Sequence, residues 1–548
     1  MQISAYVTYR ELFGQVTEGD LQRFAAAISV EDFVASLGKL TWALERDPVD
    51  VQRQLAACLP RAALRRLQRN YGAATMAFHA RFMRVVRLAL EFGQRSEARG
   101  LSTAVDCETF VRAILGVADI YDDDEALVAR NPDEWLVSMQ LRQGVHRVPH
   151  RLLATARIWH LFVELPPRLT AIHHEVALAD LPARFAAEVG LTPERYLAIC
   201  AAIVTPYETW DKTPENWAVS AEAFASTRVT NEDFGKVTAD LAADVDTLGK
   251  LFREDSAAGR TSLWDAARFA RYPLCELRPG IFLPLSPGLL YTRLVGDGFY
   301  WRIRSLYSGE RDGAAVFGAG VGRCLEVHLR EVAVSAYKAA GAPGRLFGEI
   351  PFDGTLGTDL AIAETDQLIL IEIGAGRVRY DTTVLQGRLD SLKNDAERLV
   401  SERGTQLARK ISAVRDGRLG FAGLDVKTTV IRPVVVLLEG FPRGPGIDPL
   451  VDGEIEKIAG LLGDDILPLT ILSAEEFEAA MSYVERTRRP LGTLLRDWEQ
   501  DRIEGGDLRA FVEHRRGIRP VPACMEACWE RLGDVWLTQL GFSNPGSR

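Results

Sequence analysis

The sequence predicts a multidomain α+β or α/β protein, in which a helical N-terminal region precedes a domain that contains a β-sheet flanked by helices. Three observations support this prediction. The chain has 548 residues, which is more than a single domain usually contains. Apolar residues recur at helical spacing through residues 1–265. In residues 311–485, apolar runs of strand length alternate with helical segments.

The first part of the chain, residues 1–265, consists mainly of predicted helices. Residues 81–92 show the pattern clearly, because their apolar side chains recur every three or four positions. Arg81, Arg84 and Arg87 follow the other side of this helix, and we interpret them as a solvent-exposed stripe rather than a nucleic-acid contact. We expect the region to sense a signal, select a substrate, bind a protein partner or form a homo-oligomer.

Two segments border the predicted sheet domain. In residues 266–310, Pro and Gly interrupt short apolar runs, which indicates a connector that contains β-structure. Residues 486–548 again show helical patterns and form the expected C-terminal extension.

A β-hairpin is predicted within residues 357–376. Apolar runs of strand length, 359–363 and 368–373, flank a polar turn of four residues. If these four residues are the loop, Ala363 pairs with Leu368. Counting outward then places Asp359 directly opposite Glu372.

The two opposed carboxylates need a compensating cation. Like charges at directly opposed positions destabilise a sheet, because their Cβ atoms lie only about 5 Å apart. Glu372 also stands within an apolar run, where a buried charge requires a partner. Mg²⁺ binds one or two carboxylates and leaves positions for water and phosphate. The hairpin therefore indicates a divalent-metal site at Asp359 and Glu372.

An acid after a Gly-rich turn, a short hairpin and an apolar strand with a second acid resemble the motif of the PD-(D/E)XK, or restriction-endonuclease-like, nuclease superfamily. Asp359 matches the first acid of that motif, Glu372 matches the second, and Gly374 stands where the family has lysine. Glu326 lies on a predicted helix upstream, where the family often carries a further metal-binding acid. Over residues 311–485, the order helix, three strands, helix, strand, strand, helix also resembles the family core.

The resemblance implies a mixed β-sheet core and an endonuclease that hydrolyses phosphodiester bonds, in DNA rather than RNA. It implies Mg²⁺ or Mn²⁺ as the cofactor, with Glu326, Asp359 and Glu372 as the metal ligands. Gln386 and Gln406 follow the hairpin, where related nucleases often place a glutamine near the site. The domain order resembles that of bacterial anti-phage effectors, which implies a role in defence against phages or plasmids.

The missing lysine has three interpretations. In the first, Lys393 or Lys410 on the following helix positions the attacking water in its place. In the second, Arg377 or Arg379 contacts the phosphate and the metal alone generates hydroxide. In the third, the domain is catalytically inactive and serves as a nucleic-acid-binding or scaffolding subunit.

Charge and cysteine content restrict the partners and the compartment. The net charge of −10 argues against coating of nucleic acid without sequence preference. Residues 377–418 nevertheless hold ten Lys and Arg against six Asp and Glu, so a phosphate-binding surface is expected there. The seven cysteines are scattered and odd in number, which suits a reducing cytoplasm, and Cys524 and Cys528 are interpreted as ordinary thiols.

Membrane insertion and secretion are not expected. No apolar run approaches the roughly 18 residues that a spanning helix needs. The first residues lack a basic segment followed by an apolar core. The sequence therefore predicts a cytoplasmic protein without a membrane partner.

A second enzymatic alternative is a ribonuclease. Two Arg-x4-His patterns, Arg323 with His328 and Arg509 with His514, resemble the motif of HEPN ribonucleases.

Metal sites in the first half of the chain are weakly indicated. His146 and His150 have a helical spacing, but Pro149 disfavours a regular helix between them. The acidic run 122–125 is more typical of a solvated turn than of a cation site.

Overall fold

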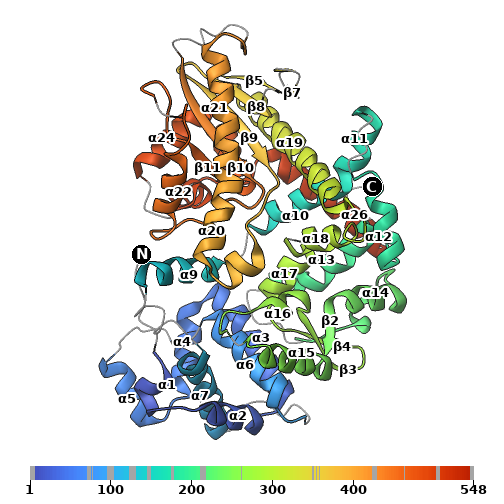
Figure 1. Cartoon of the computed structure of the whole chain (residues 1–548). Helices are drawn as coiled ribbons and strands as arrows, with labels where there is room; N and C mark the ends of the chain where they lie inside the picture. Colours follow the sequence, from blue (N-terminus) through green and yellow to red (C-terminus); the bar gives the residue numbers. More distant parts are fainter. Residues whose placement is uncertain are drawn as a thin grey trace. The chain divides into compact units, whose positions relative to one another are not determined.

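The structure of the protein is a computed structural model. It describes residues 7–70, 76, 78–95, 104–121, 131–144, 150–173, 178–209, 217–260, 262–295, 297–342, 344–348, 351–352, 355–356, 358–421, 429–461, 463–501 and 506–542. His146, the acidic run 122–125 and the last six residues lie outside the described parts. The fold is α+β, mostly helical, with two small mixed sheets (Figure 1).

The chain divides into two compact units that are discontinuous in sequence. Unit 1 comprises Met1–Pro132, Val189–Phe299 and Trp536–Arg548, and unit 2 comprises Asp133–Glu188 and Tyr300–Val535. The sequence analysis divides the chain into four consecutive segments, whereas each unit of the structure combines separate stretches of the chain. Most of the segment 266–310 belongs to unit 1, and residues 133–188 of the predicted helical module belong to unit 2.

Unit 1 combines helices with a four-stranded sheet of order β1-β4-β3-β2. Its helices are α1 (Tyr9–Phe13), α2 (Glu18–Ala27), α3 (Val30–Arg46), α4 (Pro48–Ala57), α5 (Arg61–Asn70), α6 (His79–Phe92), α7 (Ala104–Tyr121), α13 (Pro193–Thr209), η2 (Ala221–Phe224), α14 (Asn231–Leu241), α15 (Val245–Ala257), α16 (Ala267–Arg271) and α17 (Pro287–Val295). Its strands are β1 (Val219–Ser220), β2 (Ala242–Asp244), β3 (Leu274–Arg278) and β4 (Ile281–Pro284). The β-structure predicted for 266–310 is confirmed by β3 and β4.

The predicted exposure of the arginine stripe on α6 is wrong. Arg81, Arg84 and Arg87 are all buried, because α2, α3, α7 and α15 pack around α6. Arg87 forms an ion pair with Glu91 at 2.9 Å, and Arg84 stacks over the ring of Tyr121. The stripe is therefore polar but lies inside the unit, where ion pairing and ring stacking compensate part of its charge.

Unit 2 contains a five-stranded mixed sheet and a separate two-stranded hairpin. Its strands are β5 (Arg345–Phe347), β6 (Pro351–Phe352), β7 (Thr355–Leu356), β8 (Leu360–Ala363), β9 (Gln367–Gly374), β10 (Val430–Leu437) and β11 (Thr470–Ser473). Its helices are α9 (Pro132–Gly144), α10 (Arg151–Trp159), η1 (His160–Glu164), α11 (Leu165–His173), α12 (Leu181–Val189), α19 (Gly313–Ala340), η3 (Tyr380–Leu385), α20 (Leu389–Ala396), η4 (Glu397–Ser401), α21 (Glu402–Arg415), α22 (Asp448–Ile455), α23 (Ala474–Thr487), α24 (Leu491–Asp501), α25 (Leu508–Ala510) and η5 (Phe511–Arg515). Helices α18 (Asp297–Ser305) and α26 (Ala523–Leu540) cross the borders between the units, and α9 and α12 each have one terminal residue in unit 1.

The five-stranded sheet has the order β11-β10-β9-β8-β5. Strands β5, β8 and β9 are antiparallel neighbours, whereas β9, β10 and β11 run parallel. The hairpin register predicted from the sequence is confirmed, because Ala363 pairs with Leu368 and Leu360 with Ile371. Counting one position outward from this register places Asp359 opposite Glu372.

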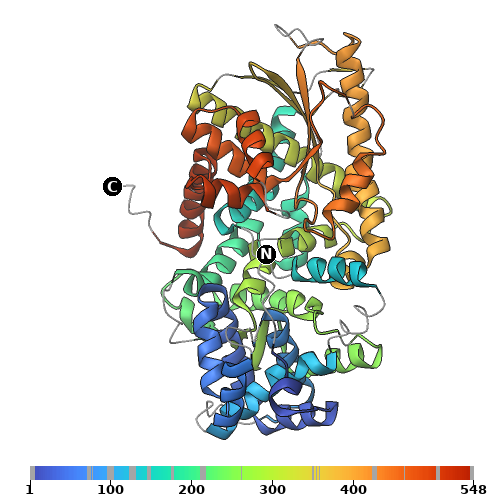
Figure 2. The same ribbon diagram turned by 90° about the vertical axis from the view of Figure 1, so that its left-hand side faces the viewer.

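Helices cover both faces of this sheet, as its edge-on view in Figure 2 shows, with α20 and α21 on one side and α23 on the other. Side chains alternate between the two faces along a strand. Leu368 and Leu370 pack with Leu407 of α21 in one buried cluster. Glu372 therefore faces α21 as well.

The glycines of α19 predict opposite stability effects. A Cβ at the exposed Gly318 would meet open space, so Gly318→Ala is expected to stabilise the protein by about 0.5–1 kcal/mol through reduced backbone entropy. A Cβ at Gly320 would lie 2.8 Å from Leu178, so Gly320→Ala is expected to cost about 1–3 kcal/mol. Urea unfolding of the two variants checks the prediction, and equal effects would contradict it.

Among the helices that the structure describes, none is long and apolar enough to cross a membrane.

Candidate active site

Two acids of the hairpin form the base of the site. Glu372 lies in β9 and is only 3% exposed. Asp359 immediately precedes β8, and its Oδ2 accepts a hydrogen bond of 2.8 Å from the backbone N–H of Ile373. The hydrogen bond fixes the Asp359 carboxylate beside the strand that carries Glu372.

A lysine from α21 reaches these acids. Lys410 Nζ forms an ion pair with Oε1 of Glu372. Burial lowers the pKa of Lys410, and the negative charges of Asp359 and Glu326 act against this shift. Glu326 comes from α19, where it pairs with Arg323 at 3.3 Å. Lys410 is one of the two lysines predicted to replace the missing motif lysine.

Arg403 is a site residue that the sequence analysis missed. Its guanidinium fills the space over Gly374, where a Cβ would overlap it, and its Nη1 donates to the Ile373 carbonyl at 2.9 Å. Burial lowers the pKa of Arg403, while Asp359 and Glu326 act against the shift. Arg403 and Lys410 are seven residues apart, two helical turns, so both lie on the same face of α21.

The carboxylates suit a hard divalent cation by their chemistry. Glu326, Asp359 and Glu372 offer only oxygen donors, which Mg²⁺ prefers. Their ligand atoms are not all within 4.8 Å of one another. Lys410 holds Glu372 and a backbone N–H holds Asp359, so the acids are compensated by cations and a hydrogen bond.

The other predicted site residues lie elsewhere in unit 2. Lys393, Gln386 and Gln406 are exposed on the surface. Arg379 is also exposed, and it pairs with the buried Asp395. Arg377 is buried, where it pairs with Glu439 and stacks over the ring of Tyr300. The structure thus brings Lys410 to the acids, places Arg377 in an internal ion pair and leaves the remaining residues on the surface.

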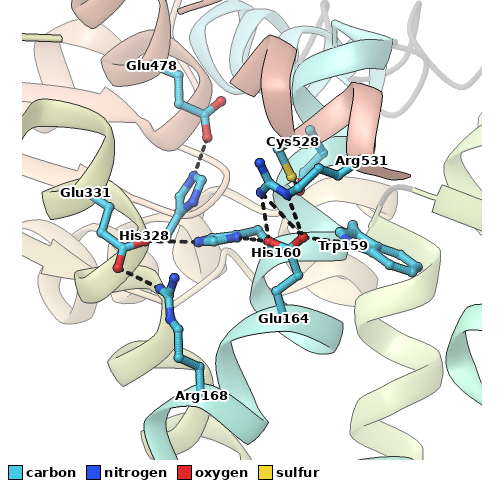
Figure 3. A network of polar contacts seen from close by, with 10 residues as sticks. Trp159, His160, Glu164, Arg168, His328, Glu331, Glu478, Cys528 and Arg531 are labelled. Carbon is cyan, nitrogen blue, oxygen red and sulfur yellow. Dashed lines mark hydrogen bonds and ion pairs between the residues drawn. The ribbon is translucent and has the colours of Figure 1, made fainter. Parts of the chain in front are cut away.

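A second cluster of titratable side chains lies in unit 2, and Figure 3 shows it with His160 at its centre. His160 Nδ1 lies 2.7 Å from Glu164, and Nε2 lies 3.3 Å from Glu331. Arg168 pairs with Glu331, and Arg531 pairs with Glu164. Negative and positive groups therefore alternate across the cluster.

The neighbouring charges and hydrogen bonds shift the pKa values of the histidine and the two glutamates in this cluster. Burial favours the neutral ring, but hydrogen bonds with Cys528, Glu164 and Glu331 raise the pKa of His160 to about 10. Burial opposes ionisation of Glu164 and Glu331, yet hydrogen bonds from His160 and the arginines lower the pKa of each to about 2. His160 is thus a charged bridge between two carboxylates.

The two histidines of the alternative ribonuclease motif have different surroundings. His328 is buried and its Nε2 lies 2.9 Å from Oε1 of Glu478. Burial lowers the pKa of His328. His514 is exposed. Since Glu478 and the surrounding core enclose His328, this residue serves an internal ion-pair network.

Substitution of Gly374 is expected to disturb the site through Arg403. In Gly374→Ala the new Cβ would displace the guanidinium, and the nucleic-acid cleavage that we propose for this site should fall by about 10–100-fold, the scale for a misplaced functional group. A plasmid-cleavage assay at equal protein concentration provides the measurement. Gly318→Ala is the matched control, because its Cβ meets open space. Full activity of Gly374→Ala would show that Arg403 has no part in cleavage.

Comparisons with models of known protein families, with curated proteins and with solved structures found no match.

Proposed function

We propose that the protein is a metal-dependent nuclease of the PD-(D/E)XK type that hydrolyses phosphodiester bonds, with DNA as the favoured substrate. One observation carries the proposal. Lys410 pairs with Glu372 at a place where Asp359 and Glu326 also act on its pKa. A lysine that is distant in sequence thus pairs with the second acid of the motif, at which the motif lysine is missing.

The order of elements supports the same proposal. Apart from the short hairpin of β6 and β7, the π-helical turns and helix α22, α19 is followed by β5, β8 and β9, then by α20 and α21, then by β10, β11 and α23. This is the order of the resemblance described above, and the sheet is mixed. The proposed role in defence against phages or plasmids rests on that resemblance alone.

Each residue of the site has a proposed part in the reaction. Glu326, Asp359 and Glu372 would hold the metal through their carboxylates. A bound Mg²⁺ or Mn²⁺ supplies charge stabilisation at the phosphate and acidifies a water molecule. Lys410 would position that water or take its proton, since a buried lysine with a lowered pKa transfers protons readily.

Arg403 would bind the phosphate. Its Nε is buried and, within the described residues, has no hydrogen-bond partner. A guanidinium with an unused donor beside carboxylates is suited to a phosphate oxygen. Arg403 and Lys410 together would neutralise the charge that develops during the reaction.

The test is a cleavage assay with the purified chain. Supercoiled plasmid, single-stranded DNA and single-stranded RNA are incubated with Mg²⁺, with Mn²⁺ and with a chelator. We expect nicked or linear plasmid with the metals and none with the chelator. Cleavage of RNA alone would show that the substrate is RNA rather than DNA. Equal cleavage with the chelator would overturn the metal-dependent mechanism.

A second candidate is an inactive nucleic-acid-binding subunit. The observation that favours it is the ion pair between Lys410 and Glu372, which compensates the acid without a metal. Binding of DNA in a gel-shift assay without cleavage under any divalent metal would support this candidate over the nuclease.

A further inference from the structure

We propose that His160, Glu164 and Cys528 bind a Zn²⁺ ion. One ligand atom from each of these side chains lies within 4.8 Å of the others, and within the described residues no other group of three His, Cys, Asp or Glu side chains is as close. Ligands of one tetrahedral zinc lie roughly 3–4 Å apart, given bonds of about 2.0–2.3 Å. Small side-chain movements would therefore complete the site.

The local fold places these three ligand side chains close to one another. His160 and Glu164 are the first and last residues of η1, a π-helical turn between α10 and α11. Such widened turns interrupt helices at functional sites frequently. Cys528 projects from α26 toward them, as Figure 3 shows. The turn and α26 are 364 positions apart at Glu164 and Cys528, so the fold creates the cluster.

The kinds of ligand atom in this cluster favour zinc over a hard cation such as Mg²⁺. Thiolate sulfur, imidazole nitrogen and carboxylate oxygen are the three ligand types that zinc takes in proteins. The hard cation proposed for the nuclease site prefers oxygen alone. The two sites therefore differ in the metals that they would bind.

The surroundings provide the outer contacts that a zinc site needs. Zinc-bound histidines usually donate their other ring N–H to a carboxylate, which orients the ring. With Nδ1 facing Glu164, His160 Nε2 is directed at Glu331 at 3.3 Å. Arg168 holds Glu331 in place. On the other side, Trp159 Nε1 donates to Oε1 of Glu164 at 3.2 Å.

Water would supply the fourth ligand. Zinc sites with three protein ligands usually keep a water molecule in the fourth position. The side chain of Glu164 is 26% exposed and that of Arg531 is 55% exposed, so solvent reaches this side of the cluster.

Co²⁺ titration of the reduced, chelator-treated full chain tests the proposal, because a cobalt–thiolate bond gives a charge-transfer absorption in the near ultraviolet. We expect one Co²⁺ per chain with this absorption, and its loss when Zn²⁺ is added. Cys528→Ser should remove the absorption, whereas Cys524→Ser, one helical turn earlier, should keep it. Glu331→Gln should retain the band and weaken Co²⁺ binding by about 10–100-fold.

Two controls separate this site from other metal binding in the chain. Glu372→Gln should leave the absorption unchanged, because that residue belongs to the proposed nuclease site. Cys58→Ser should leave it unchanged as well, which excludes the thiols of Cys58 and Cys107 that lie close together in unit 1. Absence of the absorption in the natural chain, or its persistence in Cys528→Ser, would overturn the proposal.

Discussion

Glu372→Gln is expected to reduce Mg²⁺-dependent cleavage by about 100-fold or more, the scale for loss of one preorganised electrostatic contact in an active site. The substitution keeps the size of the buried side chain and removes its charge. Lys410→Met is expected to reduce cleavage similarly. It should also destabilise the fold by about 3–5 kcal/mol, because Glu372 would remain buried at 3% exposure without its cation.

The double variant separates catalysis from folding. With both charges removed, Glu372→Gln with Lys410→Met should regain much of the stability that Lys410→Met loses, yet remain inactive. Urea unfolding and plasmid cleavage are measured on the same preparations. Lys393→Met is the matched control, since this lysine is exposed, and it should change neither quantity. An active double variant would exclude both residues from the chemistry.

Glu478→Ala is expected to destabilise the protein by about 3–5 kcal/mol, the cost of leaving a buried partner unpaired. Glu478 is completely buried and accepts two hydrogen bonds from Arg157, at 2.7 and 2.9 Å. Its Oε1 also lies 2.9 Å from His328 Nε2. The free energy of unfolding in urea provides the measurement.

An exposed ion pair is the control for Glu478. Asp390 pairs with Arg388, and both side chains are more than half exposed. Asp390→Ala should change the free energy of unfolding by at most about 1 kcal/mol. If both substitutions cost the same, the network around Glu478 does not stabilise the fold by charge pairing.

The same network predicts that stability falls in acid. Burial lowers the pKa of His328 below its ordinary 6.5. Burial acts to raise the pKa of Glu478, but Arg157 and His328 outweigh it and bring that pKa below its ordinary 4.5. At His328 the unfolded chain therefore binds a proton that the folded chain does not, and the contribution of this residue to stability is lost as the pH falls below about 6.5.

Unfolding experiments between pH 7 and 5 on the natural chain and on His328→Asn check this direction. The raised pKa of His160 contributes a pH dependence of the opposite sign in both chains, so the readout is the difference between their slopes. His328→Asn should lose less stability than the natural chain as the pH falls, because it removes the histidine whose folded pKa is lowered. Equal slopes would contradict the expected protonation state of His328.

The hairpin was predictable because its information is local. A polar turn of known length fixes the register, and alternation along the strand then places Asp359 and Glu372 together. Helix α19 and the capping box that begins α23 at Ser473 follow from equally local patterns.

Features that depend on packing could not be predicted in this way. A stripe of arginines beside an apolar face has the same pattern whether the helix lies on the surface or among other helices, and α6 is enclosed. Arg403 is recognisable only once α21 is placed over Gly374. His160 and Cys528 are far apart in sequence, and no local spacing connects them.

The placement of Arg403 over Gly374 makes the two cations of the candidate active site dependent on one helix. In the strand-borne motif the lysine is tied to its acid by the backbone, whereas here α21 carries both Arg403 and Lys410. A small shift of α21 would withdraw both positive charges together and leave the acids to repel one another. Whatever fixes the docking of this helix therefore sets the electrostatic balance of the site.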